Sequence, residues 1–119
     1  MQRVLIAQRA GAFSRSLAEA LSENFEVHIC SRGDAALELL EAIRPDVLII
    51  DLMLPCPDGL TVLKAAAYTP PQVLALTSVL NAGVLQAVRD AGVSGLLALP
   101  CTVEAVLALL KTGTPSPGR

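Results

Sequence analysis

One carboxylate stands directly after an apolar run of the chain. Asp51 follows Val47 to Ile50, so a strand formed by this run holds the carboxylate at its carboxyl end, outside the core. In an open parallel sheet, ligands bind at the carboxyl ends of the strands. Asp51 is therefore the first candidate for chemistry, although position alone also fits a carboxylate that merely caps a loop.

The residues that end the other apolar runs offer few charges to accompany Asp51. Gln8 and Arg9 follow the first run, Thr77 follows a later one, and Leu99 and Pro100 end the last. If these runs are neighbouring parallel strands, an amide, a guanidinium and a hydroxyl surround the carboxylate. No second carboxylate is among them, which limits the chemistry of this edge.

The pattern of apolar residues predicts the elements that position these groups. Four short runs without alternation are typical of strands buried on both faces, and a fifth run alternates, which indicates an edge strand. In chain order these runs are Val4–Ala7, Phe25–Ile29 (the alternating one), Val47–Ile50, Val73–Leu76 and Leu96–Leu99. Apolar stripes at helical spacing follow each run, so the chain alternates between strand and helix five times.

This alternation predicts an α/β fold, a flavodoxin-like doubly wound parallel sheet with strand order 2-1-3-4-5. Two helices are expected on one face and three on the other. The length of 119 residues fits one domain, which we place at residues 1–111. Residues 112–119 are rich in Gly, Pro, Ser and Thr, and are expected to form a flexible tail or linker.

Composition excludes several classes of protein. Hydrophobic residues make up 53% and charged residues 17%, which is typical of a globular chain. The net charge of −2 and the lack of a basic patch argue against direct contact with nucleic acid. No apolar segment is long enough for a signal peptide or a membrane span, so we expect a cytoplasmic location without membrane contact.

Cysteine and histidine do not form a recognisable site. Cys30, Cys56 and Cys101 are odd in number and lack a C-x-x-C pair, so free thiols are expected rather than zinc ligands. Cys56 and Cys101 follow the third and fifth predicted strands at the same end of the sheet, which leaves a redox role open. His28 lies on the predicted edge strand and is expected at the surface.

The segment D-L-M-L-P-C-P-D-G-L, residues 51–60, resembles the segment around the phosphoacceptor aspartate of response-regulator receiver domains. Other parts of residues 3–111 resemble the same family: 31–40, 44–50, the Leu76-Thr77-Ser78 motif, 90–95 and Pro100. Residues 58–63 and 99–101 are similar to receivers of sporulation-type regulators. As a set these motifs are specific, although each short piece alone is weak.

The resemblance implies a role for several residues. Asp51 would accept the phosphoryl group, Thr77 would hydrogen-bond it, and the backbone carbonyl of Met53 would complete a metal shell. The peptide bond between Leu99 and Pro100 would be cis. Phosphoryl transfer to a carboxylate brings two anions together, and the family normally neutralises them with a divalent cation and a lysine.

Several positions depart from the family's pattern. Gln8 and Arg9 stand where the family has an acidic pair that holds Mg²⁺, Leu99 replaces the lysine, and Leu96 replaces a frequent aromatic residue. We expect no bound metal and no other cofactor, with Mg²⁺ only if the degenerate site still binds it. Arg9 is expected near the metal position, where it could pair with Asp51, or else in solvent.

These residues predict a degenerate receiver, or pseudo-receiver, in phosphorelay signalling rather than an enzyme. Its expected partners are proteins: a sensor kinase or phosphotransfer protein, an output domain, and a second copy of itself in a homodimer. The alternative is an interaction or dimerisation module that works without phosphorylation. A flavodoxin-like cofactor binder is disfavoured, because the chain lacks a Gly-rich phosphate loop and has only 3% aromatic residues.

Overall fold

The computed structural model describes residues 1–112, in which five strands alternate with five helices. The strands are β1 (Gln2–Ala7), β2 (Phe25–Cys30), β3 (Val47–Asp51), β4 (Gln72–Thr77) and β5 (Gly95–Ala98). The helices are α1 (Ala12–Leu21), α2 (Gly33–Ile43), α3 (Gly59–Ala65), α4 (Ala82–Asp90) and α5 (Val103–Thr112).

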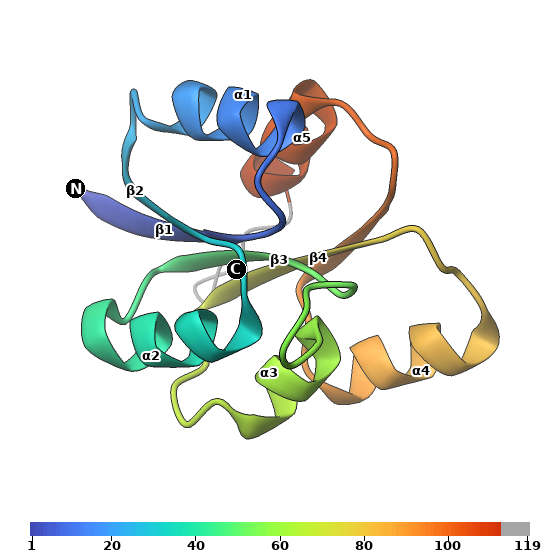
Figure 1. The fold of residues 1–119 in the computed structure, drawn as a ribbon. Helices are drawn as coiled ribbons and strands as arrows, with labels where there is room; N and C mark the ends of the chain where they lie inside the picture. Colours follow the sequence, from blue (N-terminus) through green and yellow to red (C-terminus); the bar gives the residue numbers. More distant parts are fainter. Residues whose placement is uncertain (113–119) are drawn as a thin grey trace.

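All five strands are parallel and lie in the order β2-β1-β3-β4-β5, which confirms the predicted topology (Figure 1). β3 and β4 are buried along their whole length, as their apolar runs predict. β2 lies at one edge and keeps several side chains partly exposed, which explains its alternating sequence.

The helices form two layers. α1 and α5 cover one face of the sheet, and α2, α3 and α4 cover the other (Figure 1). On the first face, Leu17 of α1 and Val106 of α5 pack against Ile6 and Ile49. All four are fully buried, and burying such side chains contributes roughly 1.5–3 kcal/mol each.

The second face has its own core. Leu40 of α2 and Val62 of α3 pack against Leu5 and Leu48, which alternate along their strands with the residues of the first face. These contacts on both faces hold the middle strands in place, and therefore hold the carboxyl ends from which the site is built.

Several helix ends follow their local sequence. Gly92 adopts a φ of 74° just after α4, and the Thr102 hydroxyl accepts a hydrogen bond from the Ala105 N–H at 3.1 Å where α5 begins. Arg44, before Pro45, ends α2 in the left-handed region with a φ of 44°. A glycine after a helix, a threonine at its start and a residue before proline at its end are each typical of these positions.

The last strand is shorter than the sequence indicates. Leu99 was expected in the strand, but β5 ends at Ala98. The Leu99 N–H still donates to the Thr77 carbonyl at 2.8 Å, whereas Pro100 has no N–H with which to continue the ladder. The Leu99–Pro100 peptide is cis, as predicted, and a second cis peptide at Cys56–Pro57 was not foreseen.

The C-terminal boundary is only partly visible. α5 includes Thr112, the first residue of the predicted tail, and residues 113–119 lie outside the described residues. Within residues 1–112, the helices are too short or too polar to cross a membrane.

Candidate functional site

The ends of three neighbouring strands bring the candidate residues together. β1 pairs with β3 through Ala7 and Ile50, so Gln8 and Asp51 each follow a paired residue. β3 pairs with β4 through Asp51 and Leu76, and Thr77 is the next residue of β4. The fold therefore places the predicted amide, carboxylate and hydroxyl side by side at the carboxyl edge of the sheet.

The Asp51 carboxylate is fixed by the loop that follows it. Its side chain is buried, and Oδ1 accepts a hydrogen bond from the Met53 N–H at 2.8 Å. Gly59 approaches the same turn so closely that a Cβ there would lie 2.5 Å from the Asp51 carbonyl oxygen. A glycine at this position therefore allows α3 to pack directly against the site.

Two backbone hydrogen bonds join the loop after Asp51 to the start of α2. The Gly33 N–H donates to the Pro55 carbonyl at 2.8 Å, and the Asp34 N–H donates to the Cys56 carbonyl at 2.9 Å. The loop between β3 and α3 is thus hydrogen-bonded through its backbone to the start of α2. Cys56 within it adopts a φ of 59°.

The Thr77 hydroxyl is occupied by its own loop. Oγ1 accepts from the Val79 N–H at 3.1 Å and lies 3.3 Å from the Val79 carbonyl, to which it donates. Thr77 is almost fully buried. To bind a group held on Asp51, the hydroxyl has to exchange these contacts for new ones.

Gln8 and Arg9 differ in burial. Gln8 is buried, whereas Arg9 is exposed and forms no ion pair with Asp51 or any other carboxylate in the described part of the chain. Of the two expected positions, Arg9 therefore takes the one in solvent and not the pair with Asp51. The Arg9 guanidinium stays in water, because an exposed ion pair contributes only about 0–1 kcal/mol to stability.

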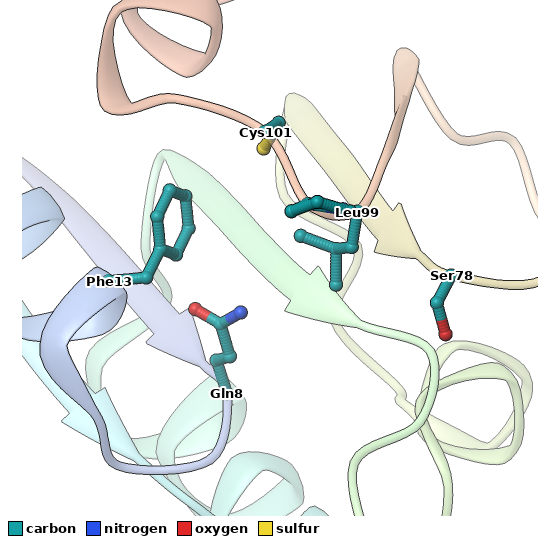
Figure 2. Close-up of a pocket in the computed structure, with 6 residues that line it drawn as sticks. Gln8, Phe13, Ser78, Leu99 and Cys101 are labelled. Carbon is teal, nitrogen blue, oxygen red and sulfur yellow. The ribbon is translucent and has the colours of Figure 1, made fainter.

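An open hollow of about 390 Å³ lies beside Gln8, on the side of the sheet that α1 and α5 cover. Figure 2 shows its lining, which consists of Gln8, Phe13, Ser78, Leu99, Pro100 and Cys101. The Gln8 amide oxygen lies on the side of Phe13 and the amide nitrogen on the side of Leu99 (Figure 2). None of these six described residues is charged.

The strand ends offer few oxygen ligands for Mg²⁺. This ion prefers near-octahedral oxygen coordination with one or two carboxylates. Asp51 supplies a single carboxylate, and Gln8 supplies a neutral amide in place of a second one. Residues 1–112 contain no cluster of three or more His, Cys, Asp or Glu side chains that could hold a metal ion.

The cysteines remain separate thiols. Cys101 lines the hollow, whereas Cys56 lies in the loop bound to the start of α2. All three cysteines are free, and burial raises the pKa of the Cys30 thiol to about 11. His28 bonds Glu26 at 2.7 Å on the edge strand and does not contribute to the site.

Phe13 and Ser78 line the same hollow, which the sequence alone did not predict. In the sequence, Phe13 is one of the apolar residues at helical spacing after the first strand, and Ser78 belongs to the Leu76-Thr77-Ser78 motif. Phe13 lies in the first turn of α1, directly above the end of β1, and this position is the signal that could have identified it.

Comparison with known proteins gives a consistent family match. The model of the response regulator receiver domain matches residues 4–111. The response regulator MprA of Mycolicibacterium vanbaalenii is 33% identical over 98% of this chain and 53% of its own length. MprA of Mycobacterium ulcerans is 33% identical over 92% of this chain and 48% of its own length. The chain thus spans about half the length of the curated relatives it matches.

Solved structures share the fold. The chemotaxis protein CheY4 of Vibrio cholerae superimposes with a TM-score of 0.84 at 26% identity, covering 94% of this chain and 98% of its own. A CheY-like receiver domain protein of Methanospirillum hungatei has a TM-score of 0.85 at 22% identity, covering 94% of this chain and 92% of its own. The agreement extends over nearly all described elements.

Proposed function

Because this chain belongs to the response regulator receiver domain family, we propose that it is a degenerate receiver in which Mg²⁺-dependent phosphorylation of Asp51 is weak or absent. In this proposal the domain has no enzymatic activity of its own. It regulates a two-component or phosphorelay response through contacts with other proteins.

The observation that carries this proposal is the lack of positively charged groups beside Asp51. A phosphoryl group on a carboxylate needs cations close by, because both partners are anionic. Gln8 and Leu99 are neutral, and Arg9 extends into solvent without a partner among the described carboxylates. Asp51 keeps the Met53 N–H, which supports a carboxylate but does not neutralise a phosphoryl group.

Exposure to acetyl phosphate with millimolar Mg²⁺ tests the proposal, with intact mass as the measurement. The natural sequence is expected to gain little or no phosphoryl mass. A variant that combines Gln8→Asp, Arg9→Asp and Leu99→Lys is expected to gain it, because both metal-binding carboxylates and the lysine are supplied.

The control adds Asp51→Asn to that triple variant, which removes the acceptor and should abolish the gain of mass. The proposal is contradicted if the natural sequence is phosphorylated at Asp51 as fully as the triple variant.

The partners in this proposal are a sensor kinase or phosphotransfer protein on the input side and an output domain on the other. The curated relatives are about twice as long as this chain, which supports an output region in the whole protein. Direct contact of this domain with nucleic acid is not part of the proposal, because the net charge is −2. The resemblance to sporulation-type receivers stays a prediction.

A second candidate is an interaction or dimerisation module that never uses Asp51. Three apolar side chains in α4 and the loop before it support this: Val79, Leu80 and Leu85 are 41%, 51% and 39% exposed. Covering such side chains is a common basis of protein association. Light scattering on the unmodified protein, compared with a Leu80→Ser, Leu85→Ser variant, tests it.

Association that the double variant abolishes supports the module. Ile29 is 48% exposed on the opposite edge of the sheet, and Ile29→Ser serves as the matched control. A monomeric natural protein, or equal loss with Ile29→Ser, contradicts self-association through α4.

A further inference from the structure

The Gln8 side chain is buried without a hydrogen bond. Only 8% of the residue is exposed, and its Oε1 has no partner among the described atoms. The amide nitrogen also has no protein partner in residues 1–112, but it is accessible to solvent, whereas the backbone N–H of Gln8 donates to the Cys30 carbonyl at 3.0 Å. Buried polar atoms are normally paired, so the unpaired Oε1 is a cost that the fold carries.

This amide lies against the hollow between α1 and the end of β5. Phe13, Leu99, Pro100 and Cys101 give the hollow apolar walls, and Ser78 completes the lining beyond Leu99 (Figure 2). Small-molecule sites typically combine apolar walls with a few polar groups and enclose roughly 300–1,000 Å³. The hollow is open to solvent and, at about 390 Å³, has room for a small molecule, as do two other surface hollows of about 420 and 350 Å³; the Gln8 amide distinguishes this one.

The absence of charge in the lining selects the class of ligand. A buried ion needs a countercharge, and none of the six described lining residues provides one. The carboxylate nearest along the sheet edge, Asp51, repels an anion. A carboxamide offers one acceptor and two donor hydrogens, so its best complement is a neutral group that carries an N–H beside a C=O.

We infer that this hollow binds a small uncharged molecule with an apolar body and a carboxamide or lactam edge, which pairs with the Gln8 amide. The inference rests on the proposed function, because the neutral residues Gln8 and Leu99 line the hollow where typical receivers carry charged groups. The amide can turn either atom toward the ligand, since neither atom gives up a protein hydrogen bond by rotating.

The ligand would be sensed by the residues that surround Asp51. Leu99 in the wall of the hollow is bonded through its N–H to the Thr77 carbonyl, and Ser78 follows Thr77 directly. A molecule held between Gln8 and Leu99 therefore contacts the same strand ends as a phosphoryl group on Asp51 would. Occupancy of the hollow takes the place of phosphorylation as the signal.

Titration with three probes of nearly equal size tests the inference, with amide chemical shifts as the measurement. Benzamide carries the complementary edge, acetophenone lacks the N–H, and benzoate is an anion. The titrations contain neither Mg²⁺ nor a phosphodonor. Benzamide is expected to shift the side-chain amide of Gln8 and the backbone amides of Ser78 and Cys101 saturably, with at least about fivefold tighter binding than either other probe.

Two variants locate the effect. Gln8→Met keeps the length of the side chain and removes the amide, so benzamide affinity should fall at least about fivefold, to that of acetophenone. Gln72 is also buried, and its Nε2 donates to the Leu110 carbonyl at the far end of β4. Gln72→Met is the matched control and should leave benzamide binding unchanged.

The inference is overturned if benzamide causes no saturable shift, if it binds no better than benzoate or acetophenone, or if Gln8→Met binds it as well as the natural sequence does. The probe comparison uses the natural protein, so it decides the matter even where a variant fails to fold. Phosphorylation of Asp51 in the acetyl phosphate assay would reject the degenerate receiver while leaving benzamide binding intact, so the two failures are distinguishable.

Discussion

Replacing Gln8 by Met is expected to stabilise the protein. The two side chains have similar length, but Met has no polar atom that loses water on burial. An unpartnered buried amide costs about 1–3 kcal/mol, and the hollow beside Gln8 places the expected gain near the lower end, about 1 kcal/mol. With an unfolding entropy of about 2.1 cal/mol/K per residue, this gain raises Tm by about 4 °C.

Urea unfolding and thermal unfolding followed by circular dichroism measure the change. Gln72→Met is again the control, because Gln72 is as buried as Gln8 but donates to the Leu110 carbonyl at 3.4 Å. Losing that bond should lower the free energy of unfolding by about 0.5–1.5 kcal/mol. The two substitutions are chemically identical, yet they should shift stability in opposite directions.

The reasoning is refuted if Gln8→Met lowers the unfolding midpoint, or if both variants shift it equally in the same direction. Either result would mean that the Gln8 amide is satisfied in the native state, and its fit to a ligand would lose its basis.

The remaining predictions concern other parts of the same edge. Gly59→Ala should lower the free energy of unfolding by more than about 2 kcal/mol, because the new Cβ would lie 2.5 Å from a backbone oxygen. Gly83→Ala, at an open position in α4, should raise the free energy of unfolding by about 0.5–1 kcal/mol, and urea unfolding measures both changes. Iodoacetamide should modify exposed Cys56 rapidly and Cys30 only on unfolding, because burial raises the pKa of the Cys30 thiol to about 11; equal labelling in peptide mass spectrometry would contradict this. Asp58→Ala should cost about 1 kcal/mol at neutral pH, because the carboxylate caps α3. Hydrogen bonds from the first turn of α3 hold the pKa of Asp58 below 3.8, so its contribution is present above that pH and is lost below it; in acid the unfolding curves of variant and natural protein should converge.

Much of the fold could be predicted because burial has a clear signature in sequence. Val47–Ile50 is apolar at every position and lies in a central strand, whereas Phe25–Ile29 alternates and lies at an edge. Strand order followed from this contrast and from the handedness of β-α-β crossovers. The boundary at Leu99 was misplaced by one residue, since an apolar side chain is compatible with both the strand and the turn before Pro100.

The sequence predicts which residues belong to the site but not which contacts their side chains make. Asp51, Thr77 and Gln8 could be assigned to one edge, since parallel strands end together. Whether Gln8 or Arg9 faces inward depends on where β1 stops alternating, which the sequence does not mark. The contribution of Phe13 depends on how α1 lies over β1, and this is a property of the packed core.

The backbone bridge between the loop after β3 and the start of α2 has a consequence for association. Its two hydrogen bonds, from the N–H groups of Gly33 and Asp34 to the carbonyls of Pro55 and Cys56, hold the loop that follows Asp51 in place. Ordering a loop on binding usually costs a partner part of its affinity. Here that cost has already been met during folding, so a partner that docks on this edge meets a preorganised surface. The backbone amide protons of Gly33 and Asp34 should therefore exchange slowly with solvent even when no partner is bound.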